Sequence, residues 1–405
     1  MKYLKQHKEI SLILSDPRLR AIAIYTLCSS FVLWYGIEKI FLKNTLNLTT
    51  TQITSFPLIY MITTLILEFP SSILSDRWSR TKTLALSTGC LLISSLLGGL
   101  SHSYFSYLIS VVVWGAASSF HSGTSQALVY DSLKSIKQEG KYLKVNVFLQ
   151  RLFGLSLFIS ISLGGYLLDL LNPRSIYFLE VPTAILGTAV ILLVKEPTFH
   201  KKDQELTAYK HVLKTIKSTI VNKSLGLRII ISALVVSVYA NYVYEFSPLS
   251  YLKIGIDQKW IGLLTAIAGT LGYFILGGLV DKFKASWWQP VLMITSTGFA
   301  IAAFIATNWF LLLVSMFILL LSQSYANDIN DAKLHDLAPS SERASVASLS
   351  GLVGGIMAAL SYPLLNLSMN RLGDSGYLLV SAFVGITVVI LSLYIYAKER
   401  HSHAS

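Results

Sequence analysis

The chain has 405 residues, of which 53% are hydrophobic and 13% are charged. Soluble globular proteins carry about 25% charged residues, so this composition predicts a polytopic membrane protein and excludes an ordinary soluble domain. A net charge of +12 would suggest nucleic acid as the partner of a soluble protein, but here the positive charge lies in the segments between apolar runs. The two cysteines, Cys28 and Cys90, lie inside apolar runs and predict neither a disulfide framework nor a thiolate metal site.

Apolar stretches of roughly 20 residues, the length that crosses a bilayer as a helix, follow one another along the chain. The first begins near Leu19 after a basic segment and lacks a small-x-small cleavage site, so we expect a retained span rather than a signal peptide. The predicted spans are 19–41, 52–75, 83–101, 104–128, 145–170, 175–194, 226–250, 260–280, 287–306, 309–328, 344–368 and 375–396. They predict an all-α protein with twelve transmembrane helices.

The 33 lysines and arginines are unevenly divided between the two sides of the membrane that this topology defines. With a cytoplasmic N-terminus, the outer side receives only Lys39, Lys43, Arg174, Lys253, Lys259 and Arg371. Because positive residues concentrate on the cytoplasmic side, both termini are expected in the cytoplasm, with the protein in the inner membrane. Anionic lipid of the inner leaflet, and not nucleic acid, is then the expected partner of the excess charge.

After the sixth predicted span the composition changes and charged residues return. Within Tyr209–Ile220, apolar residues recur every four positions against lysines, which predicts an amphipathic helix on the inner leaflet. Six predicted spans precede this segment and six follow it. We therefore expect a six-helix half at 1–195, a cytoplasmic amphipathic linker at 196–225, and a second six-helix half with a short tail at 226–405.

A short charged turn joins the second and third predicted spans. Its pattern resembles the loop between helices 2 and 3 of the major facilitator superfamily, G-x-x-x-D-[RK]-x-G-[RK]-[RK]. Asp76, Arg77 and Arg80 match this pattern, whereas Ser72 and Ser79 stand where the family has glycine. The resemblance implies a secondary transporter that needs no cofactor.

The second half carries a weaker copy of this turn. Asp281 and Lys282 follow the eighth predicted span, 205 residues after Asp76 and Arg77. The resemblance implies two pseudo-symmetric six-helix halves that alternate access to a substrate path between them. It also implies that Asp76, Arg77, Arg80, Asp281 and Lys282 form an inner gate. The alternative is that they are ordinary topology cations with charge-balancing acids.

Carboxylates inside predicted spans are costly unless they are protonated, paired or facing water, so each is a candidate functional residue. Glu68 shares one helical stripe with Ser72 and Asp76. It is either a proton-coupling carboxyl or a structural partner of a cation on a neighbouring helix. Glu180, just before Pro182, is expected to support a kink or to pair with a cation at the outer end of its span.

Two other acids are framed by aromatic or polar residues. The two groups are Trp34, Tyr35 and Glu38 in span 1 and Asn241, Tyr242 and Glu245 in span 7. The resemblance implies that spans 1 and 7 line the central cavity. An acid framed by rings suits a cationic or amphipathic organic ligand, through ion pairing and cation–π contact. An interfacial aromatic belt with a partly hydrated acid is the alternative.

Polar residues also mark spans 4 and 10. Span 10 carries Gln323, Asn327 and Asp331 at spacings of four, with Asp328 on the neighbouring stripe. Side chains so placed cannot face lipid, so we expect them to face the cavity or the other half. In span 4, Gln126 is a candidate for the same cavity, and His121 is either a hydrogen-bonded packing histidine or a proton relay.

The sequence contains no Walker loop, His-Glu-x-x-His zinc motif or Gly-x-Ser-x-Gly elbow, so ATP drive, a bound metal and hydrolase chemistry are not expected. The favoured function is proton-coupled export of a small organic, cationic or amphipathic solute by a monomer. Proton-coupled or facilitative uptake of a metabolite is the alternative. A membrane-embedded enzyme with its active site in the polar region Asn327–Asp336 is a remote alternative.

Overall fold

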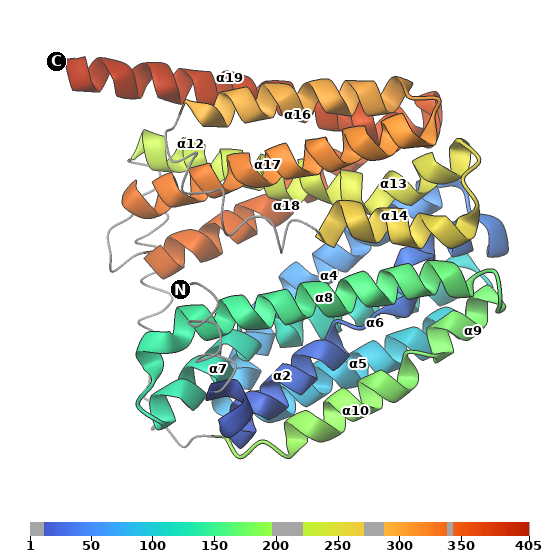
Figure 1. Ribbon diagram of the computed structural model, residues 1–405, viewed down its shortest axis with the longest axis vertical. Coiled ribbons are helices and arrows are strands. Elements are labelled where there is room, and N and C mark those ends of the chain that lie inside the picture. Colours follow the sequence, from blue (N-terminus) through green and yellow to red (C-terminus); the bar gives the residue numbers. More distant parts are fainter. Residues whose placement is uncertain (1–11, 197–221, 271–286, 338–342, 405) are drawn as a thin grey trace. The chain divides into compact units, whose positions relative to one another are not determined.

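The computed structural model describes residues 12–196, 222–270, 287–337 and 343–404, and all regular secondary structure in these ranges is helical (Figure 1). Contacts divide the chain into two compact units. Where described, the first unit comprises residues 1–48, 59–201 and 258–266, and the second comprises 49–58, 202–257 and 267–405. The predicted borders at 195 and 226 stay predictions, and the amphipathic helix expected at Tyr209–Ile220 lies outside the described residues.

The helices of the first unit follow the first six predicted spans. Their bounds are α2 (Pro17–Ser29), η1 (Leu33–Gly36), α3 (Glu38–Ile40), η2 (Phe41–Thr45), α5 (Arg80–Leu100), α6 (Tyr104–His121), α7 (Thr124–Ser135), η3 (Glu139–Lys141), α8 (Tyr142–Leu167), α9 (Pro173–Phe178) and α10 (Val181–Leu192). Helix α4 (Thr50–Arg77) begins among residues of the second unit and ends in the first. Helix α5 packs against α6, α9 and α10, and α2 packs against α8 and α10 (Figure 1).

The second unit follows the later spans. Its helices are α12 (Lys223–Ser232), η4 (Ala233–Ala240), α13 (Asn241–Lys253), α16 (Trp288–Ile305), α17 (Trp309–Leu337), α18 (Arg343–Leu372) and α19 (Gly376–Ala404). Helix α14 (Gln258–Thr270) begins in the first unit and ends in the second. Within the second unit, α16 packs against α17 and α19, and α18 packs against η4 and α19.

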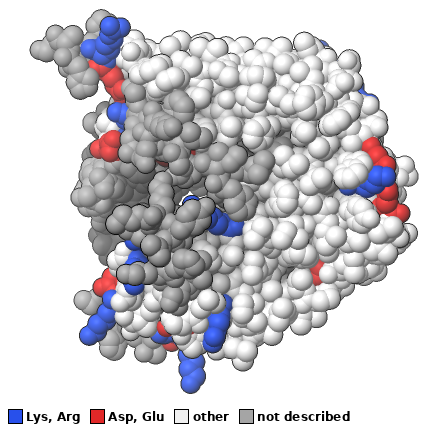
Figure 2. All heavy atoms as spheres, in the orientation of Figure 1, with Lys and Arg blue, Asp and Glu red and all other residues white. Residues whose placement is uncertain are grey.

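Ten helical stretches among the described residues are long and apolar enough to cross a bilayer. Two expected spans are not among them: α6 has 18 residues with several serines, and α14 has 13 residues and stops where the description ends. On the face drawn in Figure 2, the described surface is largely uncharged and charged side chains lie mainly toward the helix ends. The all-α, multi-pass membrane architecture is therefore confirmed, while the count of twelve spans stays a prediction.

Hydroxyl groups hold α5 to its neighbours. The Ser87 hydroxyl donates to the carbonyl oxygen of Ala117 at 2.7 Å, and the hydroxyl oxygens of Thr88 and Thr188 lie 2.7 Å apart. Helices surrounded by lipid gain little from burying apolar surface against one another, so close packing and such interhelical hydrogen bonds stabilise the bundle.

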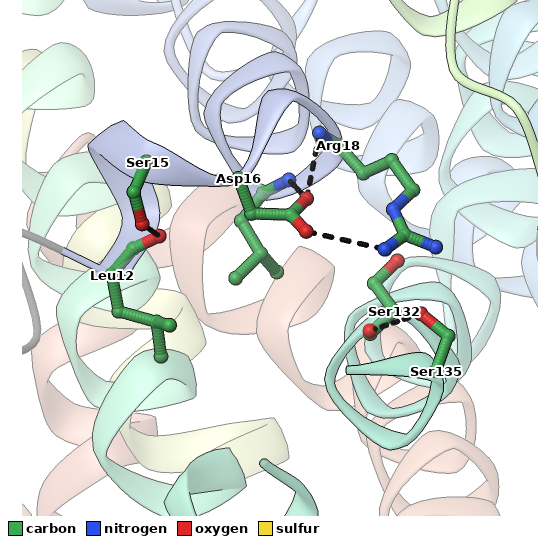
Figure 3. A network of polar contacts seen from close by, with 7 residues as sticks. Leu12, Ser15, Asp16, Arg18, Ser132 and Ser135 are labelled. Carbon is green, nitrogen blue, oxygen red and sulfur yellow. Dashed lines mark hydrogen bonds and ion pairs between the residues drawn. The ribbon is translucent and has the colours of Figure 1, made fainter. Parts of the chain in front are cut away.

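A capping carboxylate fixes the start of α2. Asp16 Oδ1 accepts hydrogen bonds from the backbone N–H of Arg18 at 2.8 Å and of Leu19 at 3.2 Å. Partial burial raises the pKa of Asp16, but the hydrogen bonds from Arg18 and Leu19 outweigh it and hold the pKa below its usual value. Figure 3 shows the Arg18 guanidinium beside Ser132 of α7, so the same cap places the beginning of α2 against α7.

Several predicted spans are not continuous α-helices. Span 1 leaves the helix at Ser30–Val32, and span 4 is interrupted at Ser122 and Gly123. Gly123 has φ +68°, a conformation that favours glycine. Span 7 widens into the π-helix η4 between α12 and α13. Because discontinuous helices at corresponding positions of two repeats mark binding sites in transporters, the irregular parts of spans 1 and 7 are the first places to look for a site.

A buried arginine joins three helices of the second unit. Arg228 of α12 is 1% exposed, and its guanidinium lies 2.5 Å from Oε1 of Glu399 on α19. Asn330 of α17 accepts from the guanidinium at 3.4 Å and donates from its amide to the Arg228 carbonyl oxygen at 2.8 Å. The end of α19 is therefore connected to α12 and α17.

Removal of residues 397–405 is expected to lower the free energy of unfolding by about 3 kcal/mol, since it takes the Glu399 carboxylate away from a buried guanidinium. Thermal unfolding of the purified protein in detergent measures this loss. Removal of 402–405 alone is the control and should leave the melting temperature unchanged. Equal melting temperatures for the two truncations would contradict the structural role of Glu399.

Candidate functional site

An aromatic cluster surrounds the irregular middle of span 1. The ring centroids of Trp34 and Trp114 lie 4.9 Å apart, and those of Tyr60 and Trp114 lie 4.5 Å apart. Tyr35 reaches Trp114 at 5.6 Å, and Trp34 stacks on Tyr177 at 5.4 Å. Trp34 is buried, whereas Tyr35, Tyr60 and Trp114 are partly exposed, so some of their ring surface is accessible to a ligand.

Two glycines let η1, which carries Trp34 and Tyr35, lie directly against α8. A Cβ atom on Gly36 would stand 2.6 Å from the carbonyl oxygen of Ile161, and one on Gly164 would overlap the carbonyl oxygen of Leu33. Larger residues would push the two segments apart. The backbone therefore fixes the position of the aromatic cluster.

Glu38 does not form an open anionic site. It is 2% exposed, and its Oε2 lies 2.5 Å from Nζ of Lys39, which is 4% exposed. Its Oε1 accepts a hydrogen bond from the Tyr107 hydroxyl at 2.8 Å, and that hydroxyl lies 3.1 Å from the Tyr177 hydroxyl. Lys39 was predicted only as a topology cation, and this buried ion pair was not predicted.

Glu180 lies at the start of α10, behind the aromatic cluster. Its side chain is fully buried, and neither carboxyl oxygen has a hydrogen-bond partner in the described part of the chain. Its polar neighbours include Trp34 and Ser95, and the Trp34 indole N–H donates to the Ser95 hydroxyl at 3.0 Å. The helix is interrupted here, between α9 and α10, with Pro182 in the first turn of α10. The expected ion pair of Glu180 with an outer cation does not occur within the described ranges.

The Glu68 side chain contacts span 4 where its helix is interrupted. Its Oε1 accepts a hydrogen bond from the Ser122 hydroxyl at 3.2 Å. The helix that starts there, α7, has Gly123 as its cap and so no capping side chain, and the positive end of its dipole favours a nearby carboxylate. Glu68, Ser72 and Gln126 are all exposed within the first unit, so this polar surface is accessible to a solute.

His121 is the last residue of α6, just before the same break, and contacts α2. Its Nδ1 is 3.3 Å from the Tyr25 hydroxyl, and the two rings stack with centroids 5.9 Å apart. The Tyr25 hydroxyl also donates to the Leu84 carbonyl oxygen at 3.2 Å. These contacts fit the packing-histidine alternative, and the proton-relay role stays a prediction.

Two residues predicted for the gate, Asp76 and Arg80, lie together in the first unit. The Arg80 guanidinium forms an ion pair with Asp131 of α7 and lies 3.8 Å from Oδ1 of Asp76. It also donates to the Ala127 carbonyl oxygen at 3.1 Å. Arg80 therefore ties the ends of α4 and α7 to the start of α5.

The turn before α5 has a second anchor. Glu196, just after α10, accepts hydrogen bonds from the backbone N–H of Arg80 at 3.0 Å and from the Ser79 hydroxyl at 2.6 Å. Arg77 is exposed at the end of α4. Asp131 and Glu196 were not predicted as members of this group, which we call the Arg80 cluster. Asp281 and Lys282, the predicted second copy, lie outside the described residues.

In the second unit, polar residues of span 10 contact span 7 at its irregular segment η4 and at the end of α12. The Ser232 hydroxyl lies 3.3 Å from Asn327 Oδ1 and 3.2 Å from Asp331 Oδ1, and the Asn327 amide donates to Asp331 Oδ2 at 3.1 Å. The Gln323 amide donates to a backbone carbonyl of η4 at 3.2 Å. Asp328 is half-buried near Asp331. The predicted polar face of α17 thus contacts the wall formed by α12 and η4.

The second acid group of the sequence analysis gathers around a tyrosine of α18. Asn241 and Glu245 both lie near Tyr362, and the rings of Tyr242 and Tyr362 are 5.3 Å apart. The Tyr242 hydroxyl also bonds the Ser361 hydroxyl. Tyr362 was missed because nothing in the sequence joins spans 7 and 11.

An apolar groove of about 280 Å³ lies beside the break in span 1. It is lined by Leu27, Cys28, Phe31, Leu155, Ser156, Ile159 and Thr183. The Ser156 hydroxyl donates to the Leu27 carbonyl oxygen at 2.7 Å and so satisfies a backbone group at the end of α2. The rest of the lining is suited to a hydrocarbon chain. Within the described ranges, no group of three or more His, Cys, Asp or Glu side chains could hold a metal ion.

Comparison with known proteins identifies the family. The model of the Major Facilitator Superfamily matches residues 21–362. The chain belongs to the major facilitator superfamily. It is therefore a membrane transporter rather than an enzyme, and the predicted family is confirmed. No curated protein sequence matches the chain significantly.

Solved structures of several transporters share the fold of this superfamily member. The nucleoside transporter NupG has 14% sequence identity and a TM-score of 0.71, with 94% of this chain and 98% of that chain covered. The D-xylose–proton symporter has 13% identity and a TM-score of 0.70, with 96% and 97% covered. A bacterial homologue of the human lysosomal transporter Spinster has 15% identity and a TM-score of 0.68, with 95% and 98% covered. At these identities the likeness concerns the fold alone.

Proposed function

We propose that this major facilitator superfamily transporter exports a small aromatic or amphipathic organic cation in exchange for protons. The observation that carries the proposal is the aromatic cluster, in which partly exposed rings from three spans surround Trp34, a neighbour of the buried Glu180. An aromatic face attracts an organic cation within about 6 Å, by roughly 0.5–2 kcal/mol per ring. Rings from three spans, Tyr35, Tyr60 and Trp114, can therefore contribute together.

The proposed mechanism is alternating access by two six-helix halves, with the transporter acting as a monomer in the cytoplasmic membrane. The Arg80 cluster, whose ion pairs lie within the first unit, is the proposed inner latch, because a difference in these contacts between the two states would shift the balance between them. Glu68 and Glu245 are candidates for proton coupling, since intramembrane acids are costly to keep without a role. Glu38, the third acid predicted for this role, lies in a buried ion pair with Lys39.

Everted membrane vesicles test the proposal, with ethidium as an aromatic monocation. Energised vesicles that contain the transporter should accumulate ethidium, and a protonophore should abolish the accumulation. Trp114→Ala should reduce the initial rate about fivefold, because it removes a ring contribution of about 1 kcal/mol. Trp309→Ala is the matched control, because Trp309 is 50% exposed at the start of α17, outside the aromatic cluster. Accumulation that ignores the protonophore, or equal effects of both variants, would contradict the proposal.

A second candidate function is uptake of a polar metabolite. The exposed polar surface formed by Glu68, Ser72 and Gln126 favours it, since it could hydrogen-bond an uncharged solute. A D-xylose–proton symporter and a nucleoside transporter are among the proteins with a similar fold. Uptake of a labelled pentose or nucleoside by intact cells, without ethidium transport in vesicles, would favour this candidate.

A further inference from the structure

We propose that Glu180 is the proton-binding carboxyl of the transporter, and that its ionisation makes the aromatic cluster favourable for an organic cation. This inference rests on the proposed exchange of a cation for protons. It gives that exchange a specific residue, one that was expected from the sequence to support a kink or to pair with an outer cation.

Burial and missing partners indicate that Glu180 is protonated in this conformation. The side chain is fully buried, and neither carboxyl oxygen has a hydrogen-bond partner among the described residues. An ionised carboxylate in this position would lose its hydration and have no cation within ion-pair distance among the described residues, which is far more costly than burying a neutral acid. The structure is therefore consistent with an occluded proton.

Two hydrogen-bond donors lie near Glu180 and could stabilise its ionised carboxylate. The Trp34 indole N–H now donates to the Ser95 hydroxyl, and both groups are neighbours of the Glu180 carboxyl. When Glu180 ionises, the Ser95 O–H can rotate and the Trp34 N–H can turn toward the negative oxygen. Trp34 packs against Trp114 in the aromatic cluster. Loss of the proton from Glu180 therefore changes the charge and the hydrogen bonding beside the place where the cation is proposed to bind.

The other charged groups nearby set the sign of the effect. Glu38 and Lys39 form an ion pair and cancel each other. Arg174 of α9 forms no ion pair with an acid among the described residues. Its guanidinium donates to backbone carbonyl oxygens that include that of Gly99 and lies 5.6 Å from the Phe41 ring. With Glu180 protonated, no acid balances Arg174 among the described residues of this region, and Arg174 opposes a cation. His102, whose Nδ1 lies 3.2 Å from the Arg174 guanidinium, is the other titratable group beside it.

Ionisation of Glu180 removes that excess positive charge. The hydroxyls of Tyr107 and Tyr177, which lie between Glu38 and Glu180, hydrogen-bond each other and stay neutral at physiological pH. A proton and an organic cation therefore disfavour each other's binding, and this coupling is reciprocal. Mutual exclusion of this kind is what an exchanger needs.

Infrared spectroscopy of the purified transporter tests the proton site without any substrate. The wild-type protein at neutral pH should show a carboxylic-acid C=O stretching band from a buried group. Glu180→Gln should lose this band, whereas Glu139→Gln, at an exposed acid of η3, should keep it. Absence of the band in the wild type, or its persistence in Glu180→Gln, would overturn the proposal.

Trp34→Phe provides a second test, which holds even if Glu180→Gln fails to fold. It keeps a ring but removes the N–H that would stabilise the ionised carboxylate, so the band should persist to higher pH than in the wild type. An unchanged pH dependence would refute the role of Trp34 as the coupling donor.

Ethidium binding, followed by fluorescence, separates this inference from the proposed function. Wild-type affinity should increase with pH, and Glu180→Gln should bind ethidium about tenfold more weakly with no pH dependence, since the amide imitates the protonated acid. A pH-dependent affinity that survives in Glu180→Gln would overturn the role of Glu180. If the wild type binds no ethidium while the infrared band behaves as expected, the proposed substrate class fails and the proton site stands.

Discussion

Glu38→Gln is expected to lower the free energy of unfolding by about 3–5 kcal/mol, because it removes the carboxylate that balances the buried Lys39 ammonium. The substitution also weakens the hydrogen bond from the Tyr107 hydroxyl, because its acceptor is a charged carboxylate in the wild type and would be a neutral amide in the variant. Thermal unfolding in detergent, followed by tryptophan fluorescence, measures the loss.

The double variant Glu38→Gln, Lys39→Met is the informative comparison. Replacing both members of a buried ion pair by neutral groups removes the desolvation cost of both charges, so most of the stability should return. Glu139→Gln controls for the loss of a carboxylate at an exposed position. If the single variant is as stable as the wild type, or the double variant is no better than the single one, the pair does not have the role that its burial indicates.

Arg80→Met is expected to reduce transport at least tenfold while the protein still inserts into the membrane. The guanidinium is the common partner of Asp131, Asp76 and the Ala127 carbonyl oxygen, so its loss removes the group that joins α4, α5 and α7. A change of about 1.4 kcal/mol in the balance between two states already changes an equilibrium tenfold. Ethidium transport in everted vesicles, normalised to the amount of inserted protein, is the measurement.

Two companion variants separate charge from geometry at this position. Arg80→Lys keeps the charge but has no planar fork, so it should recover only part of the activity. Lys82→Met removes a cation two residues away that is exposed and lies over the Trp78 ring, 5.3 Å from its centroid, and it should transport normally. Full activity of Arg80→Met, or an equal loss in Lys82→Met, would show that the Arg80 cluster is not a latch.

Hydropathy and the charged turn were sufficient to predict the membrane class, the family, and the approximate position of most spans. The breaks in the spans were harder to predict. Ser30–Val32 contains neither proline nor glycine, and the irregular backbone there depends on contacts from α8, such as Ser156 to the Leu27 carbonyl oxygen. Gly123 was visible in the sequence, but a glycine in an apolar stretch is more often a packing residue than a helix end.

The partners of the candidate acids could not be read from the sequence for a related reason. Neighbours along a regular helix point in different directions, so Glu38 and Lys39 were not expected to pair. They do pair because α3 has only three residues and lies between two irregular segments. Asp131 pairs with Arg80 from about 50 residues away in the chain, a distance over which spacing gives no prediction of contact.

The central claim is that a proton and an organic cation move in opposite directions through this transporter. Proteoliposomes that enclose a pH-sensitive dye test it directly when ethidium is added outside without any imposed gradient of pH. The internal pH should rise as ethidium enters, and liposomes without protein should show no change. Entry of ethidium with a constant or falling internal pH would contradict proton exchange.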